Sequence, residues 1–132
     1  MKKFLFSVIT LFIVSFASAQ ATATMVDDAP FNYEDVEVRP EFPGGYNELL
    51  SFIGKNFKLN DYEGYGGTIK IAFIIEADGT VTNVKVVKDI GGGTGPEAKR
   101  VISTSPRWSS GEIGGKKVRV LYELPIKIAG QG

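Results

Sequence analysis

The chain has 132 residues, a length that fits one domain, and its 15 basic and 15 acidic side chains leave no basic excess of the kind that indicates nucleic-acid binding. It contains no cysteine and no histidine, which excludes disulfides, thiolate nucleophiles, a histidine base and zinc sites with nitrogen or sulfur ligands. No other residues resemble a nucleophile with its base, so we predict a protein without catalytic activity, cofactor, metal ion or small-molecule substrate.

The N-terminal segment Met1–Ala19 has the layout of a secretory signal peptide. Lys2 and Lys3 precede an apolar run, Phe4–Phe16, and Ala17–Ala19 forms a small-x-small cleavage site. The apolar run is shorter than the roughly 20 residues that a membrane-spanning helix needs. We therefore predict cleavage after Ala19 and export of the remaining chain; an uncleaved membrane anchor is the alternative.

A lead-in and a helix follow the signal peptide. Residues 20–39 mix small, acidic and aromatic side chains without a sustained period, which predicts an extended or disordered segment. Pro40–Gly45 is rich in proline and glycine and marks the start of the folded domain, predicted over residues 40–132. Tyr46–Asn56 carries one apolar stripe at helical spacing and predicts a helix, and residues 58–67 predict a loop.

The most apolar stretch outside the N-terminus, Thr68–Glu76, predicts a central strand. Ile69, Ile71, Phe73 and Ile75 recur at every second position, as expected for a strand with one face on a core. Ala77–Thr80 contains an Asp-Gly pair that favours a tight turn. Val81–Lys88 is therefore predicted to return antiparallel to the first strand.

A glycine-rich run, residues 91–95, leads into a second helix. We interpret the run as a flexible linker; phosphate binding is the alternative, although neither a P-loop lysine nor a dinucleotide-binding register follows it. Pro96–Ile102 opens the helix, since proline is tolerated in the first turn. Trp108, the only tryptophan, is predicted to close one end of the core.

The last predicted element is a long strand, Lys116–Ile128, with strict alternation. Pro125 has no amide hydrogen, and prolines in sheets lie mainly at edges or bulges, so this strand is predicted at an edge. A crossover through the second helix places it beside the central strand. The assembled prediction is an α+β fold: a three-stranded antiparallel sheet, order 2-1-3, with two helices packed on one face.

These pieces together resemble the C-terminal domain of TonB-type energy transducers, over residues 40–128. The matching segments are EFPGG and its helix (Glu41–Phe57), GTIKIAFIIEADGTV (Gly67–Val81), NVKVV (Asn83–Val87), GPEAKRVI (Gly95–Ile102), PRW (Pro106–Trp108) and GKKVRVLYELPI (Gly115–Ile126). The order and spacing of the segments carry the resemblance, rather than any one of them. The family often has Tyr-Pro after the first helix, whereas Glu63 follows Tyr62 in this chain. The family's connector commonly carries a proline after the tryptophan, where this chain has Ser110.

The resemblance implies a periplasmic domain whose last strand accepts an extended peptide from a TonB-dependent outer-membrane transporter. Strand addition of this kind uses the unpaired backbone groups of a sheet edge. The predicted peptide-binding residues are Val118, Arg119, Val120, Leu121, Tyr122 and Glu123, with Arg119, Leu121 and Glu123 as the outward side chains.

Two alternatives stay open. The same edge could pair with a second copy of the chain, giving a self-associating structural domain, or it could be covered by the protein's own N-terminal segment. Full-length transducers also carry an inner-membrane helix with a proton-coupled histidine and a proline-rich spacer. This sequence has no histidine, so the sequence leaves open whether the domain takes part in energy transduction.

Overall fold

The computed structural model describes residues 29–58 and 65–129. The predicted signal peptide, Met1–Ala19, and the lead-in as far as residue 28 lie outside the described residues, as does most of the predicted 58–67 loop. Within the described ranges, no helix is long and apolar enough to cross a membrane.

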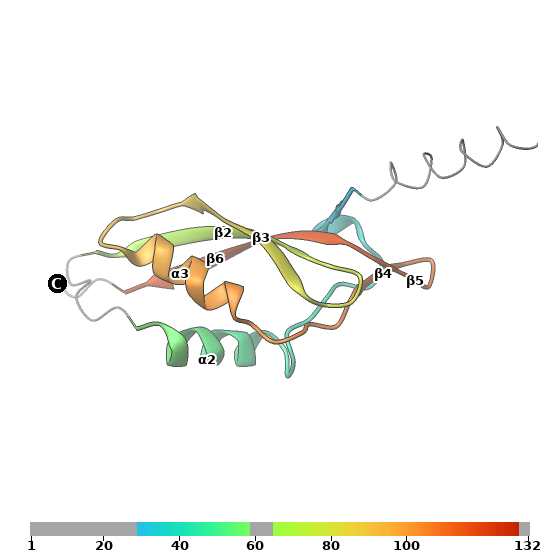
Figure 1. Ribbon diagram of the computed structural model, residues 1–132, viewed down its shortest axis with the longest axis horizontal. Coiled ribbons are helices and arrows are strands. Elements are labelled where there is room, and N and C mark those ends of the chain that lie inside the picture. The colour runs from blue at the N-terminus through green and yellow to red at the C-terminus, as the bar shows by residue number, and fades with distance from the viewer. Residues whose placement is uncertain (1–28, 59–64, 130–132) are drawn as a thin grey trace, which may run out of the picture.

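The main sheet is built around β2 (Gly67–Ile75), the strand predicted from the alternating isoleucines. It pairs antiparallel with β3 (Val81–Lys88) on one side and with β6 (Val120–Ile128) on the other (Figure 1). Asp78 fixes the turn between β2 and β3, because its carboxylate accepts hydrogen bonds from the backbone N–H and the hydroxyl of Thr80. The β2–β6 ladder runs without a shift from Gly67↔Ile128 to Ile75↔Val120.

The predicted three-stranded antiparallel sheet of order 2-1-3 is wrong. The main sheet has four strands in the order β1-β6-β2-β3, and it is mixed because β1 (Phe31–Asn32) pairs parallel with β6. The last strand, predicted at an edge, therefore lies between β1 and β2. A separate two-stranded sheet is formed by β4 (Gly111–Ile113) and β5 (Lys116–Val118). A strand as short as β1 shows no alternation, so the sequence pattern does not reveal it.

The predicted last strand, Lys116–Ile128, is two strands in the structure. Gly114 and Gly115 both have positive φ angles, 59° and 78°, and form the turn that folds β5 back on β4. The chain leaves the ladder at Arg119 and enters the main sheet as β6. The break therefore removes Lys116–Val118 from the strand that the sequence predicted.

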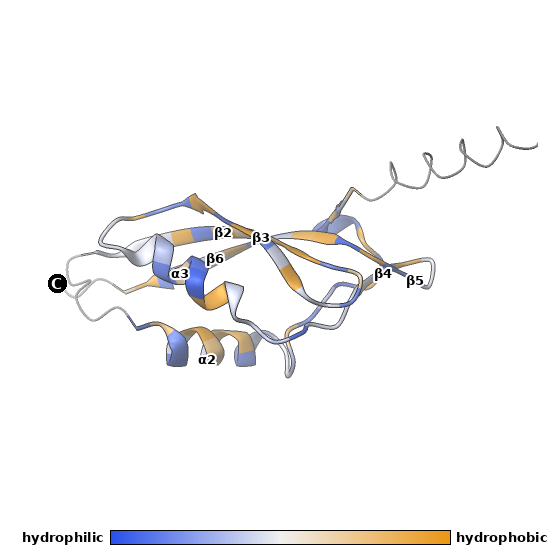
Figure 2. Cartoon of the chain, in the orientation of Figure 1, coloured by the Kyte–Doolittle hydropathy of each residue, from blue (hydrophilic) through white to orange (hydrophobic). Residues whose placement is uncertain are grey.

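Two helices cover one side of the main sheet, α2 (Tyr46–Asn56) and α3 (Thr94–Ser103) (Figure 1). The core joins the inward residues of β2 and β6 with apolar residues of both helices, and Figure 2 shows hydrophobic and hydrophilic segments alternating along α2 and α3. Its fully or nearly buried members are Leu49, Ile53, Ile69, Ile71, Phe73, Ile75, Ala98, Val101, Ile102, Leu124 and Ile126.

Trp108 closes the core, as predicted. Its side chain is buried, and its ring lies 5.7 Å from that of Phe42, 5.6 Å from that of Phe73 and 6.1 Å from that of Tyr122, measured between centroids. Its backbone N–H donates to the carbonyl of Gly79 at 2.8 Å, which ties this end of the core to the β2–β3 turn.

The glycine run before α3 forms a turn whose backbone N–H groups could bind an anion. A carboxylate of the chain itself already binds them. The carboxylate of Asp89 accepts hydrogen bonds from the backbone N–H groups of Gly91, at 3.0 Å, and Gly95, at 3.1 Å. A Cβ added at Gly95 would overlap this carboxylate. The phosphate-binding alternative therefore has no support at this helix start, because Asp89 occupies the place of a phosphate.

Candidate functional site

The outer edge of β6, the side away from β2, is the candidate site. Pro125 has no N–H to donate, so the uninterrupted β2–β6 ladder places its backbone on the outer side. Backbone groups alternate along a strand, so Leu121, Glu123 and Lys127 also direct their N–H and C=O groups outward. The carbonyl of Arg119 follows the same alternation, because it accepts a hydrogen bond from the N–H of Phe31 on the outer side.

One end of this edge is already paired with a strand from the same chain. Phe31↔Val120 and Asn32↔Leu121 are in parallel register, and the N–H of Phe31 donates to the carbonyl of Arg119 at 2.9 Å. After Asn32 the chain turns away from the edge of β6 through a one-turn 3-10 helix, η2 (Tyr33–Asp35). The strand β1 thus covers the outward backbone groups near Leu121. It leaves the outer edge from Glu123 onward unpaired by β1.

Tyr122 adds an aromatic contact to this pairing. Its ring stacks on that of Tyr33 with centroids 4.3 Å apart and planes at 27°, and the guanidinium of Arg39 lies 5.2 Å from the Tyr33 centroid. Burial raises the pKa of Tyr122 to about 12, so its hydroxyl stays neutral at physiological pH. The stack holds η2 against the sheet.

The predicted site residues are divided among different environments. Val118 pairs with Gly111 in the small sheet and is not part of β6. Val120 is fully buried, and Tyr122 is half-buried on the same face. Leu121 is 39% exposed and Glu123 is exposed, with its carboxylate 3.8 Å from the ammonium of Lys70. The structure therefore brings Leu121, Tyr122 and Glu123 together at the outer edge of β6, where β1 pairs with Leu121 and Tyr33 stacks on Tyr122.

Arg119, predicted as an outward side chain, forms an ion pair with Glu76. Its Nε lies 2.7 Å from one carboxylate oxygen and its terminal nitrogen 3.1 Å from the other, in the two-point geometry that suits a guanidinium. These hydrogen bonds from Arg119 hold the pKa of Glu76 below its usual value. The pair fixes the backbone at the entry to β6, where the carbonyl of Arg119 meets β1.

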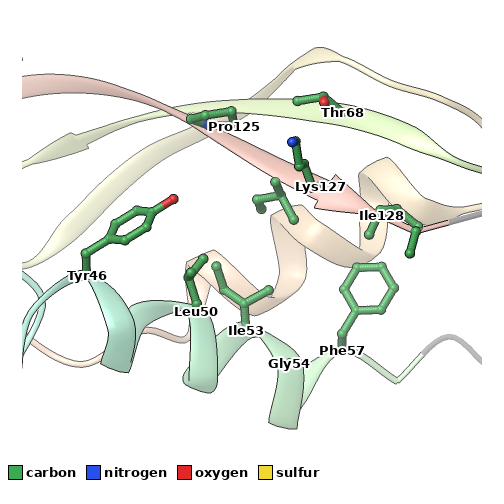
Figure 3. A pocket seen from close by; sticks show the side chains of 11 residues that line it. Tyr46, Leu50, Ile53, Gly54, Phe57, Thr68, Pro125, Lys127 and Ile128 are labelled. Atoms are coloured by element: carbon green, nitrogen blue, oxygen red, sulfur yellow. The ribbon is translucent and has the colours of Figure 1, made fainter.

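Beyond β1 the open edge adjoins a groove of about 740 Å³ between α2 and the second half of β6. Figure 3 shows Tyr46, Leu50, Ile53 and Phe57 pointing from the helix side toward the strand that carries Pro125 and Ile128. Tyr46 is 54% exposed and Leu50 is 43% exposed, so the helix presents apolar surface here. The remaining lining residues are Gly54, Thr68, Ile126, Lys127 and Ala129.

Sequence reasoning missed Phe31 and Tyr33, which complete the site as the structure has it. Both lie in the lead-in predicted as extended or disordered, where the aromatic residues were the one available signal. Part of this segment packs on the domain: Val36 is buried, as is Pro40 directly after the segment, and Val38 forms an isolated bridge with Glu112.

Comparison with protein families gives one match: residues 59–127 fit the model described as the Gram-negative bacterial TonB protein C-terminal. No curated protein and no solved structure matches the chain. The family consists of protein-interaction domains of TonB-related transport that act in the periplasm and generally bind outer-membrane transporters. The matched segment includes α3, β2 to β5 and most of β6, and so contains the candidate edge. The chain belongs to the family of C-terminal domains of Gram-negative bacterial TonB proteins.

Proposed function

We propose that this domain binds an extended peptide of a TonB-dependent outer-membrane transporter by adding it as a strand to the outer edge of β6. The observation that carries the proposal is that this edge accepts a parallel strand, β1, in the structure itself. Strand addition draws its affinity from backbone hydrogen bonds, which any extended peptide can make, and its selectivity from neighbouring side chains. We further propose that the chain acts in the periplasm after removal of Met1–Ala19.

Pro125 limits where a peptide pairs. The outward groups from Arg119 to Glu123 form a continuous row, whereas Pro125 offers a carbonyl and no N–H. A peptide strand would therefore pair along Arg119–Glu123 and lose its regular ladder at Pro125. This range contains the predicted residues Arg119, Val120, Leu121, Tyr122 and Glu123; Val118 lies before it, in β5.

The groove beside α2 would supply side-chain selectivity. A peptide that runs parallel to β6, as β1 does, and continues past Glu123 reaches the groove lined by Tyr46, Leu50 and Pro125. Apolar side chains of the peptide would bury the exposed surface of Leu50 and Tyr46 there.

The test uses synthetic peptides that span the periplasmic N-terminal segments of outer-membrane transporters from the same bacterium. Leu121→Pro removes an N–H that faces the outer edge and leaves the β2–β6 hydrogen bonds in place. Pro125, two outward-facing positions further along β6, is already accommodated in this way. Lys127→Pro makes the same change on the other side of Pro125 and is the matched control. We expect Leu121→Pro to weaken peptide binding about 5- to 50-fold, since it removes a hydrogen bond and disturbs its neighbours.

Isothermal titration of both variants and the unsubstituted chain gives the comparison. Equal loss of affinity in Leu121→Pro and Lys127→Pro, or none in either, would show that the peptide does not pair with this edge. Self-association through the same edge is the other candidate function. It predicts a dimer that dissociates when peptide is added, which sedimentation velocity over a concentration series detects.

A further inference from the structure

We propose that the segment Phe31–Asp35 is an internal competitor: it occupies the peptide-binding edge of β6 and must leave before a peptide binds there. This inference rests on the proposed function, because it concerns the regulation of the same edge. The occupant of the edge is a segment of the same chain, and only this segment is released while the rest of the fold stays unchanged.

The segment fills the positions that a bound peptide needs. The N–H of Phe31 uses the carbonyl of Arg119, at 2.9 Å, and the register Asn32↔Leu121 covers the next outward residue. Tyr33 covers the ring of Tyr122 at 4.3 Å. A second strand cannot pair with the same outward groups while these contacts stand, because one sheet edge accepts one neighbour. Peptide and segment are therefore mutually exclusive.

The contacts are few enough to be released. β1 pairs through two residues, both exposed, and Phe31 is 44% exposed despite its large apolar side chain. The turn η2 has no buried residue. A longer peptide strand would make more ladder hydrogen bonds than the segment that it replaces. The segment therefore lowers the apparent affinity of the edge by the fraction of molecules in which it is bound.

The chain holds the segment close after release. Residues from Val36 onward have their own attachment: the N–H groups of Glu37 and Val38 both donate to the carbonyl of Glu112 at 3.0 Å, and the side chain of Glu37 accepts from the N–H of Gly114 at 2.8 Å. Release can therefore end at Val36, which is buried. The released segment stays within a few residues of the edge and rebinds as an intramolecular ligand.

Phe31→Pro is the first test, because it deletes the N–H that donates to Arg119 without touching β6. Ala29→Pro is the matched control: Ala29 is exposed, and its N–H makes no hydrogen bond within the described residues. We expect Phe31→Pro to bind peptides about 2- to 10-fold more tightly than the unsubstituted chain, because the closed state loses one hydrogen bond and the contacts of the partly covered Phe31 ring. Ala29→Pro should bind as the unsubstituted chain does.

A disulfide lock is the second test. Asn32 and Leu121 are register partners on adjacent strands and both are exposed, so the variant Asn32→Cys/Leu121→Cys places two Cα atoms within disulfide range, at about 5 Å. The chain has no other cysteine, so the disulfide forms only there. We expect the oxidised variant to lose peptide binding at least 10-fold and the reduced variant to regain it.

The probes are the transporter peptides and a synthetic peptide of residues 29–38 of this chain, observed by titration calorimetry and by chemical-shift changes of Leu121 and Tyr122 in the full chain. Tighter binding by Phe31→Pro together with loss in the oxidised variant supports the competitor. If transporter peptides bind the oxidised and reduced variants equally and Leu121→Pro still weakens binding as expected above, the competitor is refuted while the proposed function stands. If the 29–38 peptide binds Phe31→Pro at the edge and no transporter peptide binds any variant, the edge accepts strands and the transporter assignment fails.

Discussion

The network around Glu97 gives a stability prediction that bears on the groove, because it joins the end of α2 to the start of α3. The carboxylate of Glu97 accepts from the backbone N–H of Lys58 at 2.7 Å and from two nitrogens of Arg100 at 2.9 and 2.7 Å. Arg100 also donates to the carbonyl of Asn56, the last residue of α2, at 2.6 Å. Substituting Glu97→Gln removes the charge and leaves the shape of the side chain.

The magnitude follows from these hydrogen bonds. The bonds from Arg100, with that from Lys58, lower the pKa of Glu97 from its usual 4.5 to about 2. Hydrogen bonds to charged groups are worth about 1.5 to 3 kcal/mol each, and solvent screens part of this because 14% of the side chain is exposed. We expect Glu97→Gln to lower the free energy of unfolding by about 1 to 2 kcal/mol at pH 7.

The pH dependence has a definite sign. The folded state favours the charged carboxylate, so the stabilisation is complete above the unfolded pKa near 4.5 and is lost as the pH falls toward about 2. The assay is urea unfolding, followed by circular dichroism, at pH 7, 4.5 and 2.5. Glu48→Gln is the control, because Glu48 is an exposed residue of α2 whose carboxylate makes no ion pair or hydrogen bond in the described residues. A difference between Glu97→Gln and the unsubstituted chain that stays constant from pH 7 to 2.5 would refute the electrostatic reasoning.

Two further predictions concern the β2–β3 turn and the groove beside α2. Gly79→Ala is expected to destabilise the fold by about 2 to 4 kcal/mol in thermal unfolding, since Gly79 has φ of 90° and an added Cβ would overlap the carbonyl oxygen of Trp108; an unchanged melting temperature would contradict this. Leu50→Ser is expected to weaken transporter-peptide binding about 3- to 10-fold by calorimetry, with stability nearly unchanged because Leu50 is 43% exposed. Asn47→Ser, on the same helix and outside the groove, should bind as the unsubstituted chain does.

The sequence predicted those elements whose pattern is long and regular. β2, β3 and the two helices appear where the periodicity of their apolar residues placed them, because each buries one face on the same core. Pro125 favoured an edge position for the last strand, and this is wrong because β6 lies between β1 and β2; β1 pairs only with Val120 and Leu121, so the missing N–H of Pro125 falls on the part of the outer side that β1 leaves unpaired.

The sequence left cover of that outer side by the N-terminal segment as one alternative, but it did not reveal which residues cover it. β1 is too short to show alternation, and its pairing with β6 depends on a contact between residues far apart in the chain, Phe31 and Arg119. The stack of Tyr33 on Tyr122 is likewise a tertiary contact with no local signature. The break between β5 and β6 falls at Arg119, inside the alternating run Lys116–Ile128, and that alternation favoured one strand over two.

The outer edge of β6 has two different protections, and together they define how the domain can be specific. An open strand edge invites unselective pairing, which proteins suppress with proline or with a covering segment. Pro125 blocks a regular ladder permanently on one half, while β1 covers the other half through few contacts that a better strand can replace. A second copy of the chain would have to displace the same segment as a transporter peptide would. Self-association and peptide binding are therefore alternative outcomes at one edge, and the strength of the Phe31–Asp35 contacts sets the threshold that any partner must exceed.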